Sequence, residues 1–576
     1  MNLKKQISSA LIIPILLLSI FVSTSCTQKE YAKLVVINGN VATMDDTNKT
    51  AEAIAVKGDT IFAVGTNQAI KKLIGDSTKV IDAEGKFVMP GFIESHAHFL
   101  SLGRSKKQLD LTGARSWQEI VLLVAQAADN ALPGEWVIGR GWHQEKWNSV
   151  PEPNVNGYPF HDQLSAASPN NPVLLTHASG HALFANRLAM ELAEINNETP
   201  NPSGGNIVRN KNGRAIGVFE ENAEGLIYEA RNKVSIDKSR AEKIEEIKKI
   251  VALAEKESFS KGITTFHDAG ETFEEIDYLK QIADEGNLNI RLYVIVGESN
   301  KALKDKLQDY RMIGYANNHL TVRAIKQYID GALGSRGAWL LMEYADLPDS
   351  KGQNVNSLKY LSETAEIAAG NGFQLCTHAI GDRGVREILN IYEKEIEQSE
   401  TENDFRWRIE HSQHISREDI SRYKDLNVIA AMQGIHCTSD AIFVLKRLGN
   451  LRAKEGAYVW RKLLDAGVTI CNGTDAPVED VSPINSFYAS VTRKLSTGNT
   501  FFPDQKMTRE EALKSYTMNG AFAAFEEEIK GSITKGKLAD ITILSNDLLK
   551  VPDEELLNTE VLYTIVGGEV KYQKKR

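Results

Sequence analysis

Cysteine is scarce in this chain: four cysteines occur in 576 residues. Cys26 belongs to an N-terminal segment with its own character, and the other three, Cys376, Cys437 and Cys471, show no CxxC spacing. An odd number of widely spaced cysteines argues against a disulfide framework, even in an exported protein. Cys376 and Cys471 fall in apolar runs, which predicts buried thiols.

Positive charge is also in short supply. Lysine and arginine number 67 against 76 acidic residues, the net charge is -9, and no arginine-rich patch is interleaved with aromatic residues. We therefore expect no nucleic-acid partner. The hydrophobic share of 42% and the charged share of 25% are typical of a soluble globular protein. The length suits a large barrel with appendages.

The N-terminal apolar run, "ALIIPILLLSIFV", is too short to span a bilayer comfortably and contains Pro14. Two lysines precede it and "STSC" follows, so residues 1–25 are interpreted as an export signal. Cleavage before Cys26 resembles bacterial lipoprotein processing, although Ser23 replaces the usual leucine. We expect an exported protein of the bacterial cell envelope, facing the periplasm or the outer membrane. Its membrane attachment would be a lipid on Cys26.

Both ends of the remaining chain are rich in short β-type runs. Residues 31–88 contain "KLVVING" and "AIAVKGDTIFAVG", and residues 528–576 contain "KLADITILS" and "VLYTIVGGEVKY". Neither segment alone makes a convincing core. We therefore predict that they pair into one discontinuous β-sandwich domain.

Residues 89–527 alternate short apolar strands with helical patterns, as a parallel α/β fold requires. The expected strands are eight: "VMPGFIESHAH", "GITTFHDA", "NIRLYVIVG", "TVRAIKQYID", "GFQLCTHA", "RWRIEH", "NVIAAMQG" and "GVTICNGTD". This predicts a (β/α)8 TIM barrel. Residues 104–232, between the first two strands, are too many for a loop and predict a folded insertion over the catalytic face.

Polar side chains recur where these strands end, which is the end where barrel enzymes keep their chemistry. In "HAH", positions two apart on a strand point the same way, so two imidazoles share one face. The metal-binding candidates at strand ends are His96, His98, Lys326, His378, His411 and Asp475. Several such residues from separate strands predict a shared metal site.

Four motifs, "HAH", "THAIGD", "RIEHSQ" and "GTDAPV", resemble those of the metal-dependent amidohydrolase superfamily. The additional "GRGW", "HASGHA", "EEN" and "DGALGSR" resemble its YtcJ-like branch, also called amidohydrolase family 3. The likeness covers nearly everything after the signal segment. It implies a metal-dependent hydrolase of carbon–nitrogen bonds other than peptide bonds, acting on a small molecule such as an N-acyl or N-formyl compound.

The resemblance also implies roles for the strand-end residues. His96, His98 and Asp475 would bind the more buried of one or two divalent ions, and His378 and His411 would bind the second. Zinc is the expected ion, since imidazole and carboxylate ligands suit it, although iron, manganese or cobalt could replace it. Metal-activated hydroxide would attack the carbonyl, and Asp475 would act as general base and then as general acid.

Lys326 needs a modification to serve as a ligand. An ammonium group repels metal ions, so a bridging role requires carbamylation, as in some members of the superfamily. The alternative is an ordinary ion pair with Asp330 or a neighbouring carboxylate.

The insertion and one barrel loop supply the expected substrate contacts. These are His181, Arg140, Trp142, Glu221, Asn222 and Arg336. An aromatic ring suits an apolar group, and a guanidinium suits a carboxylate or carbonyl. Packing for Trp142, an internal ion pair for Arg140 and a loop cap for Arg336 stay open as alternatives. Glu410 is expected to point away from His411. His436 follows the seventh strand and could reach the pocket, although loop histidines are usually solvated.

Other functions remain in competition. The same site could hydrolyse an ester or a lactone, because hydroxide attack on a polarised carbonyl serves both. The chain could also be a catalytically inactive envelope binding protein, since fold alone does not establish function. A carbohydrate-active barrel would need two paired carboxylates, and no such pair stands out. A homo-oligomer stays open.

Overall fold

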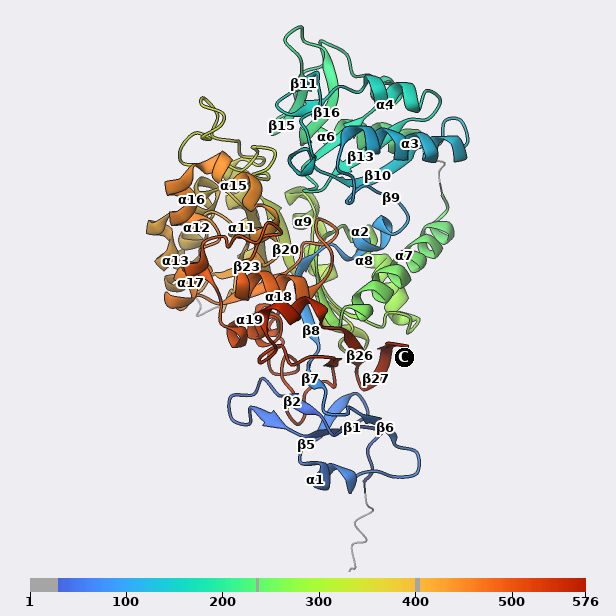
Figure 1. Cartoon of the computed structure of the whole chain (residues 1–576), viewed down its shortest axis with the longest axis vertical. Helices are drawn as coiled ribbons and strands as arrows, with labels where there is room; N and C mark the ends of the chain where they lie inside the picture. Colours follow the sequence, from blue (N-terminus) through green and yellow to red (C-terminus); the bar gives the residue numbers. More distant parts are fainter. Residues whose placement is uncertain (1–29, 235–237, 399–403, 576) are drawn as a thin grey trace, which may run out of the picture.

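The computed structural model describes residues 30–234, 238–398 and 404–575. The expected export signal and Cys26 lie outside these ranges, so export and lipid attachment stay predictions. Within the described ranges no helix is long and apolar enough to cross a membrane. A β-sandwich lies at one end of the long axis, a barrel in the middle and the insertion at the other end (Figure 1).

Eight parallel strands form the barrel. In spatial order they are β8 (Phe92–Ala97), β17 (Ile263–Glu271), β18 (Arg291–Val296), β20 (Leu320–Tyr328), β21 (Gln374–Ala379), β22 (Arg408–His411), β23 (Ile429–Gln433) and β24 (Ile470–Gly473). The ring closes just beyond β24, where the Asp475 amide donates to the His96 carbonyl and the His98 amide to the Ala476 carbonyl, both at 2.8 Å. The expected TIM barrel fold is confirmed.

Helices cover the outside of the barrel because their apolar faces match it. In α8 (Phe273–Asp284), Phe273, Ile276, Leu279 and Ile282 recur every three residues and are buried. Strand β18 is buried along its whole length, as expected for a parallel strand between a barrel interior and a helical layer. Helices α7 (Arg240–Ser260) and α8 begin with capping boxes formed by Ser239 with Glu242 and by Thr272 with Glu275, which satisfy free backbone amides.

The sandwich consists of two sheets. The first contains β1 (Leu34–Ile37), β4 (Ala53–Lys57), β5 (Thr60–Gly65) and β6 (Lys79–Asp82). The second joins both chain ends and contains β2 (Asn40–Ala42), β3 (Thr50–Ala51), β7 (Phe87–Pro90), β25 (Ile541–Leu544), β26 (Val561–Val566) and β27 (Glu569–Gln573). Val88 pairs with Ile543 across the β7–β25 ladder, and both side chains lie in one apolar core. The two ends of the chain thus share a core.

The run expected as the first barrel strand is divided in the structure. Residues up to Pro90 belong to the sandwich, and β8 starts at Phe92. Gly91 marks the division, because a Cβ there would lie 2.2 Å from the hydroxyl oxygen of Thr264. Only glycine lets the chain pass this close to β17.

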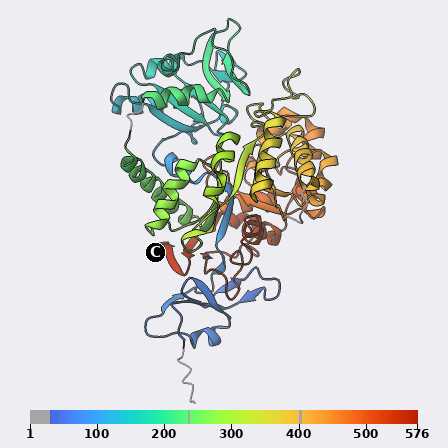
Figure 2. The ribbon, with the colours of Figure 1, turned by 180° about the vertical axis from the view of Figure 1, so that it is seen from behind.

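The insertion is a six-stranded sheet with helices. Its strands are β9 (Leu109–Asp110), β10 (Val137–Trp142), β13 (Val173–His177), β14 (Ala182–Ala185), β15 (Gly205–Arg209) and β16 (Ala215–Glu221). Helices α3 (Trp117–Asn130), α4 (Asp162–Ala167), α5 (Arg187–Leu192) and α6 (Glu224–Val234) accompany the sheet. The view from behind shows the whole insertion lying beyond one end of the barrel (Figure 2).

A buried ion pair fastens the barrel to the sandwich. Arg291 of β18 donates to both carboxylate oxygens of Asp540, at 2.7 and 3.0 Å, and its side chain is 1% exposed. Replacing Arg291 by methionine would leave the Asp540 charge buried without its partner. We expect R291M to lose about 3–5 kcal/mol of unfolding free energy, measured by urea denaturation.

The control removes an arginine from a solvated pair. Arg187 and Glu191 are 65% and 63% exposed, with 3.7 Å between their charged atoms. R187M should therefore change the unfolding free energy by less than about 1 kcal/mol. Equal values for R291M and R187M would show that the buried pair does not hold the two parts together.

Candidate metal centre and its cavity

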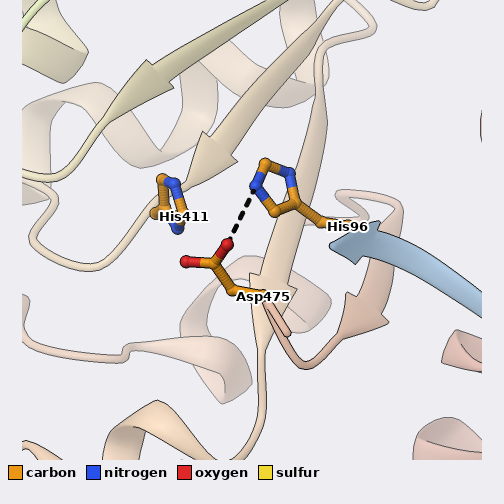
Figure 3. A group of neighbouring side chains, drawn as sticks. All are labelled: His96, His411 and Asp475. Atoms are coloured by element: carbon orange, nitrogen blue, oxygen red, sulfur yellow. Dashed lines mark ion pairs between the residues drawn. The ribbon is translucent and has the colours of Figure 1, made fainter. Parts of the chain in front are cut away.

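Three side chains from distant parts of the chain meet at the end of the barrel. His96 lies on β8, His411 ends β22, and Asp475 follows β24. Each offers one ligand atom, and these atoms all lie within 4.8 Å of one another. Figure 3 shows them facing a common point, with 3.7 Å between His96 Nε2 and Asp475 Oδ1. The three form a group able to hold a metal ion.

The other expected ligands border this group. His98 Nε2 lies 3.2 Å from Asp475 Oδ1. The rings of His378 and His411 have their centroids 4.5 Å apart. Lys326 Nζ lies 3.4 Å from His96 Nε2. The structure thus places all six residues side by side, although only His96, His411 and Asp475 meet the common distance limit among the described residues.

The chemistry of these donors fits a divalent cation. Asp475 Oδ1 and His378 Nε2 are buried and make no hydrogen bond. Burial would raise the pKa of Asp475, but His98, His411 and His96 outweigh it and hold that pKa well below its usual range. Burial lowers the pKa of His378 and His411, so both rings are neutral. Neutral imidazoles around an ionised carboxylate are the ligand form that zinc and similar ions require.

A carboxylate beneath the site fixes the orientation of His96. Glu410 accepts a short hydrogen bond from His96 Nδ1, which leaves Nε2 directed at Asp475. Arg408 holds Glu410 through two hydrogen bonds of 2.7 and 2.8 Å, and neither side chain is exposed. Although burial opposes it, the Arg408 guanidinium keeps the pKa of Glu410 well below its usual range. Such a carboxylate–histidine pair selects the tautomer of a ligand.

Glu410 is not part of the metal-binding group, as the sequence predicted, yet it lies next to that group. Its carboxylate contacts His96 across the barrel interior, and the His96 ring also lies against that of His411, with 4.8 Å between the centroids. The sequence-based argument was the alternation of side-chain directions along the strand that contains "RIEH". What the sequence could not supply was the contact between β22 and β8, which are not neighbours in the sheet.

The backbone is strained at the site. His411 and Asp475 have φ angles of 73° and 58°, in the left-handed region that residues with a Cβ seldom adopt. Gln433 Oε1 lies 2.8 Å from His411 Nδ1 and so orients that ring. Glu94 accepts hydrogen bonds from the amide and hydroxyl of Thr474, both at 2.9 Å, and joins β8 to the loop that carries Asp475. These contacts maintain the strained geometry.

A polar cavity of about 370 Å³ opens above these residues. It is lined by the ligand candidates His98, Lys326, His378, His411 and Asp475 and by the expected substrate contacts Arg140, His181, Glu221 and Asn222. Barrel and insertion therefore build one cavity.

Two expected substrate contacts lie elsewhere. Trp142 is 1% exposed, donates from Nε1 to the Leu175 carbonyl at 2.8 Å and packs in the insertion core. Arg336 forms an ion pair with Asp346 at 2.8 Å and does not line the cavity. In the structure Trp142 packs in the insertion core, and Arg336 pairs with Asp346 and lines a separate cavity of about 190 Å³ that also includes Glu221.

His181 is held by a neighbouring carboxylate. Its Nδ1 lies 2.8 Å from Glu221 Oε2. Burial lowers the pKa of the ring, but the attraction of Glu221 outweighs this, so the pKa of His181 is raised. A Cβ at Gly331 or Gly337 would lie 1.8 or 2.4 Å from Glu221 Oε1. The glycines of "DGALGSRG" therefore leave room for the carboxylate that positions His181.

Of the two alternatives for His436, the structure favours the one in which it reaches the pocket. It is 6% exposed and lies close to the metal centre, with its ring parallel to that of His411 at a centroid distance of 6.4 Å. It begins the short helix α14 (His436–Ser439) after β23 and lines a pocket together with the insertion residues His143 and Ala178. The sequence showed only a loop position.

Comparison with known proteins agrees with this geometry. The sequence pattern described as "Amidohydrolase family" matches residues 79–572. Protein LONG AFTER FAR-RED 3 of Arabidopsis thaliana is 31% identical, over 94% of this chain and 92% of its own. Putative amidohydrolase YtcJ of Bacillus subtilis (strain 168) is 29% identical over 93% and 98%. N-substituted formamide deformylase of Arthrobacter pascens is 28% identical over 94% and 98%.

A solved structure shares the architecture. An uncharacterized metal-dependent hydrolase from Pyrococcus horikoshii OT3 superposes with a TM-score of 0.71 and 25% identity, covering 90% of this chain and 99% of its own. The family match spans the barrel, the insertion and much of the sandwich. The chain therefore belongs to the amidohydrolase family, in its YtcJ-like branch (amidohydrolase family 3), and is a metal-dependent hydrolase acting on carbon–nitrogen bonds.

Proposed function

We propose that this protein hydrolyses the amide bond of a small N-acyl or N-formyl compound and that zinc is its metal. The observation that carries the proposal is the group of His96, His411 and Asp475, two of which, His411 and Asp475, line a polar cavity. A relative over nearly the whole chain, N-substituted formamide deformylase, acts on formamides by its name, which favours this bond.

The metal would be held by Asp475 and the imidazoles of His96, His98, His378 and His411. A divalent ion supplies a water whose pKa falls from 15.7 to roughly 7, and it polarises a carbonyl. Asp475 takes the proton of the attacking water and delivers it to the leaving nitrogen as the carbon–nitrogen bond breaks. The products are a carboxylic acid and an amine.

His181 would bind the substrate from the insertion side. Its Nδ1 is engaged by Glu221, so Nε2 is the nitrogen left for a substrate oxygen. The raised pKa favours the protonated, donating form of the ring. Arg140 donates hydrogen bonds to the carbonyls of Pro477 and Ala178. It would therefore hold the wall of the same cavity in place rather than offer its charge to the substrate.

We propose that Lys326 is carbamylated when metal is bound. It is 2% exposed, and burial lowers the pKa of its amine, which favours the neutral form that reacts with carbon dioxide. Conversion to a carbamate would replace a positive charge beside His96 with an anionic ligand.

A steady-state panel tests the proposed bond. N-formyl amines, N-acyl amino acids, cyclic amides and lactones are compared by kcat/KM on protein loaded with zinc. We expect an open-chain amide to exceed the lactones by at least about ten-fold, since Asp475 serves a nitrogen leaving group that must gain a proton. A preference for lactones would support the ester-type alternative.

The matched control is metal analysis of the same preparation. A hydrolase should bind at least one equivalent of metal per chain. Less than one equivalent, even after metal is supplied, together with no turnover, would favour the binding-protein alternative.

A further inference from the structure

A second, smaller pocket adjoins the metal centre and is called the side pocket here. Its volume is about 50 Å³. Ala178, Ala332, Leu333, Ile380, Phe443 and Val478 supply the apolar part of its wall, and the polar residues His143, Lys146, Gln413, Asp440 and Glu479 also line it. The insertion contributes Ala178, helix α15 (Ala441–Leu448) contributes Phe443, and loops at the ends of barrel strands contribute the others. A pocket with apolar surface and a few polar groups beside catalytic residues is the usual environment for a ligand substituent.

The side pocket and the polar cavity meet at the reacting position. Ser179, His181, His411, Asp475 and Val478 line both of them. A bond cleaved beside Asp475 therefore has one substituent within reach of the polar cavity and the other within reach of the side pocket. Because the polar cavity and the side pocket differ in size and polarity, each favours a different substituent of the cleaved bond.

The volume limits what the side pocket can take. A water-sized group needs about 10–15 Å³ in the same measure, so about 50 Å³ accommodates roughly three to five such atoms. An isopropyl or tert-butyl group fits this range. A fused aromatic ring system exceeds it.

One polar atom in the wall lacks a partner. His436 lines the side pocket, and its buried Nε2 makes no hydrogen bond. Gln413 Nε2 lies 3.1 Å from His436 Nδ1, which assigns Nδ1 as acceptor and leaves the proton on Nε2. Buried donors in native structures are normally paired. An acceptor atom of the substrate that lies outside its apolar substituent would complete this one.

We propose that the side pocket is a specificity subsite for a compact branched aliphatic substituent of about three to five non-hydrogen atoms. This rests on the proposed function, because the substituent is one arm of the amide substrate. The other arm lies in the polar cavity. The protein therefore takes amides with one small apolar arm and one polar arm.

Two substitutions change the size of the side pocket in opposite directions. A Cβ at Gly334 would lie 3.4 Å from Phe443 Cζ and 3.6 Å from His143 Nε2, an ordinary contact that occupies pocket space. G334A therefore fills the pocket, and F443L enlarges it. The control is G370A, because Gly370 is exposed near the end of helix α11 (Leu358–Asn371) with nothing within 4 Å of a new Cβ.

The probe is binding of alkyl and aryl hydroxamates to the metal-loaded protein, measured by isothermal titration calorimetry. Hydroxamates bind metal ions and project a substituent of chosen size. The series is aceto-, isobutyro-, pivalo-, benzo- and naphthohydroxamate. Wild type should bind the isobutyro or pivalo member best, gaining about four-fold in affinity for each added carbon.

The variants should move this optimum. G334A is expected to lower the affinity for pivalohydroxamate by at least about four-fold, which corresponds to the loss of space for one carbon. Its affinity for acetohydroxamate should not change. F443L should shift the optimum to benzohydroxamate. G370A should match wild type throughout. If one variant fails to fold, the other still tests the size dependence.

An affinity that rises steadily with size in wild type, or equal effects of G334A and G370A along the series, would overturn the side-pocket proposal. A size optimum without turnover of any amide in the substrate panel would support the side pocket and refute the proposed function. Amide turnover without a size optimum would support the proposed function and refute the side-pocket proposal.

Discussion

Replacing Asp475 by asparagine is expected to lower kcat by about 10²- to 10⁴-fold while KM changes much less. Asparagine keeps the shape of the side chain but cannot take a proton from water or return one to nitrogen. In the structure no other carboxylate among the described residues belongs to the metal-binding group. Steady-state kinetics on the best amide substrate measures both constants.

Loss of metal would also lower kcat in D475N, so activity is expressed per bound ion, with metal content measured on the same sample. D425N is the matched control, because Asp425 is exposed at the end of α13 (Ile420–Asp425) and does not line the polar cavity. A metal-loaded D475N that retains more than a tenth of wild-type kcat would exclude Asp475 as the proton-transfer group.

Replacing Glu410 by glutamine should weaken metal binding by about 10- to 100-fold, the usual cost of removing a carboxylate that supports a histidine ligand. Glutamine preserves the volume but removes the charge that fixes the His96 tautomer. It also leaves Arg408 buried without its ion-pair partner, which should lower the unfolding free energy by about 3–5 kcal/mol. Metal affinity is measured by competition with a chromophoric chelator.

The two effects of E410Q are separable. Denaturation of metal-free protein reports the buried Arg408, and the chelator titration of folded protein reports His96. The control is E418Q, since Glu418 is 79% exposed and pairs with Arg386. Unchanged metal affinity in E410Q would show that Glu410 has a structural role alone.

Much of the metal centre was predictable, because barrel topology converts sequence order into position. Strand ends gather at one rim, so His96, His378 and His411 could be grouped without knowing any distance. Strand alternation also predicted that Glu410 would not join His411 as a ligand, and it is not part of the metal-binding group. Both arguments use the backbone alone, which is why they transfer from sequence to structure.

Contacts between elements that are distant in the sequence were not predictable. The partner of Glu410 lies across the barrel interior, and the burial of His436 depends on how the insertion covers its loop. Trp142 and Arg336 carry side chains suited to substrate binding, but tertiary packing gave them other partners. Residue type alone does not determine whether a side chain faces the cavity or packs against other parts of the protein.

The most direct test is a crystal structure of the metal-loaded protein with anomalous diffraction recorded at the absorption edge of zinc. We predict an anomalous peak within ligand distance of His96 and Asp475, with the carbamate of Lys326 visible as added density on Nζ. Absence of any peak among His96, His411 and Asp475 after zinc has been supplied would contradict the proposed metal centre.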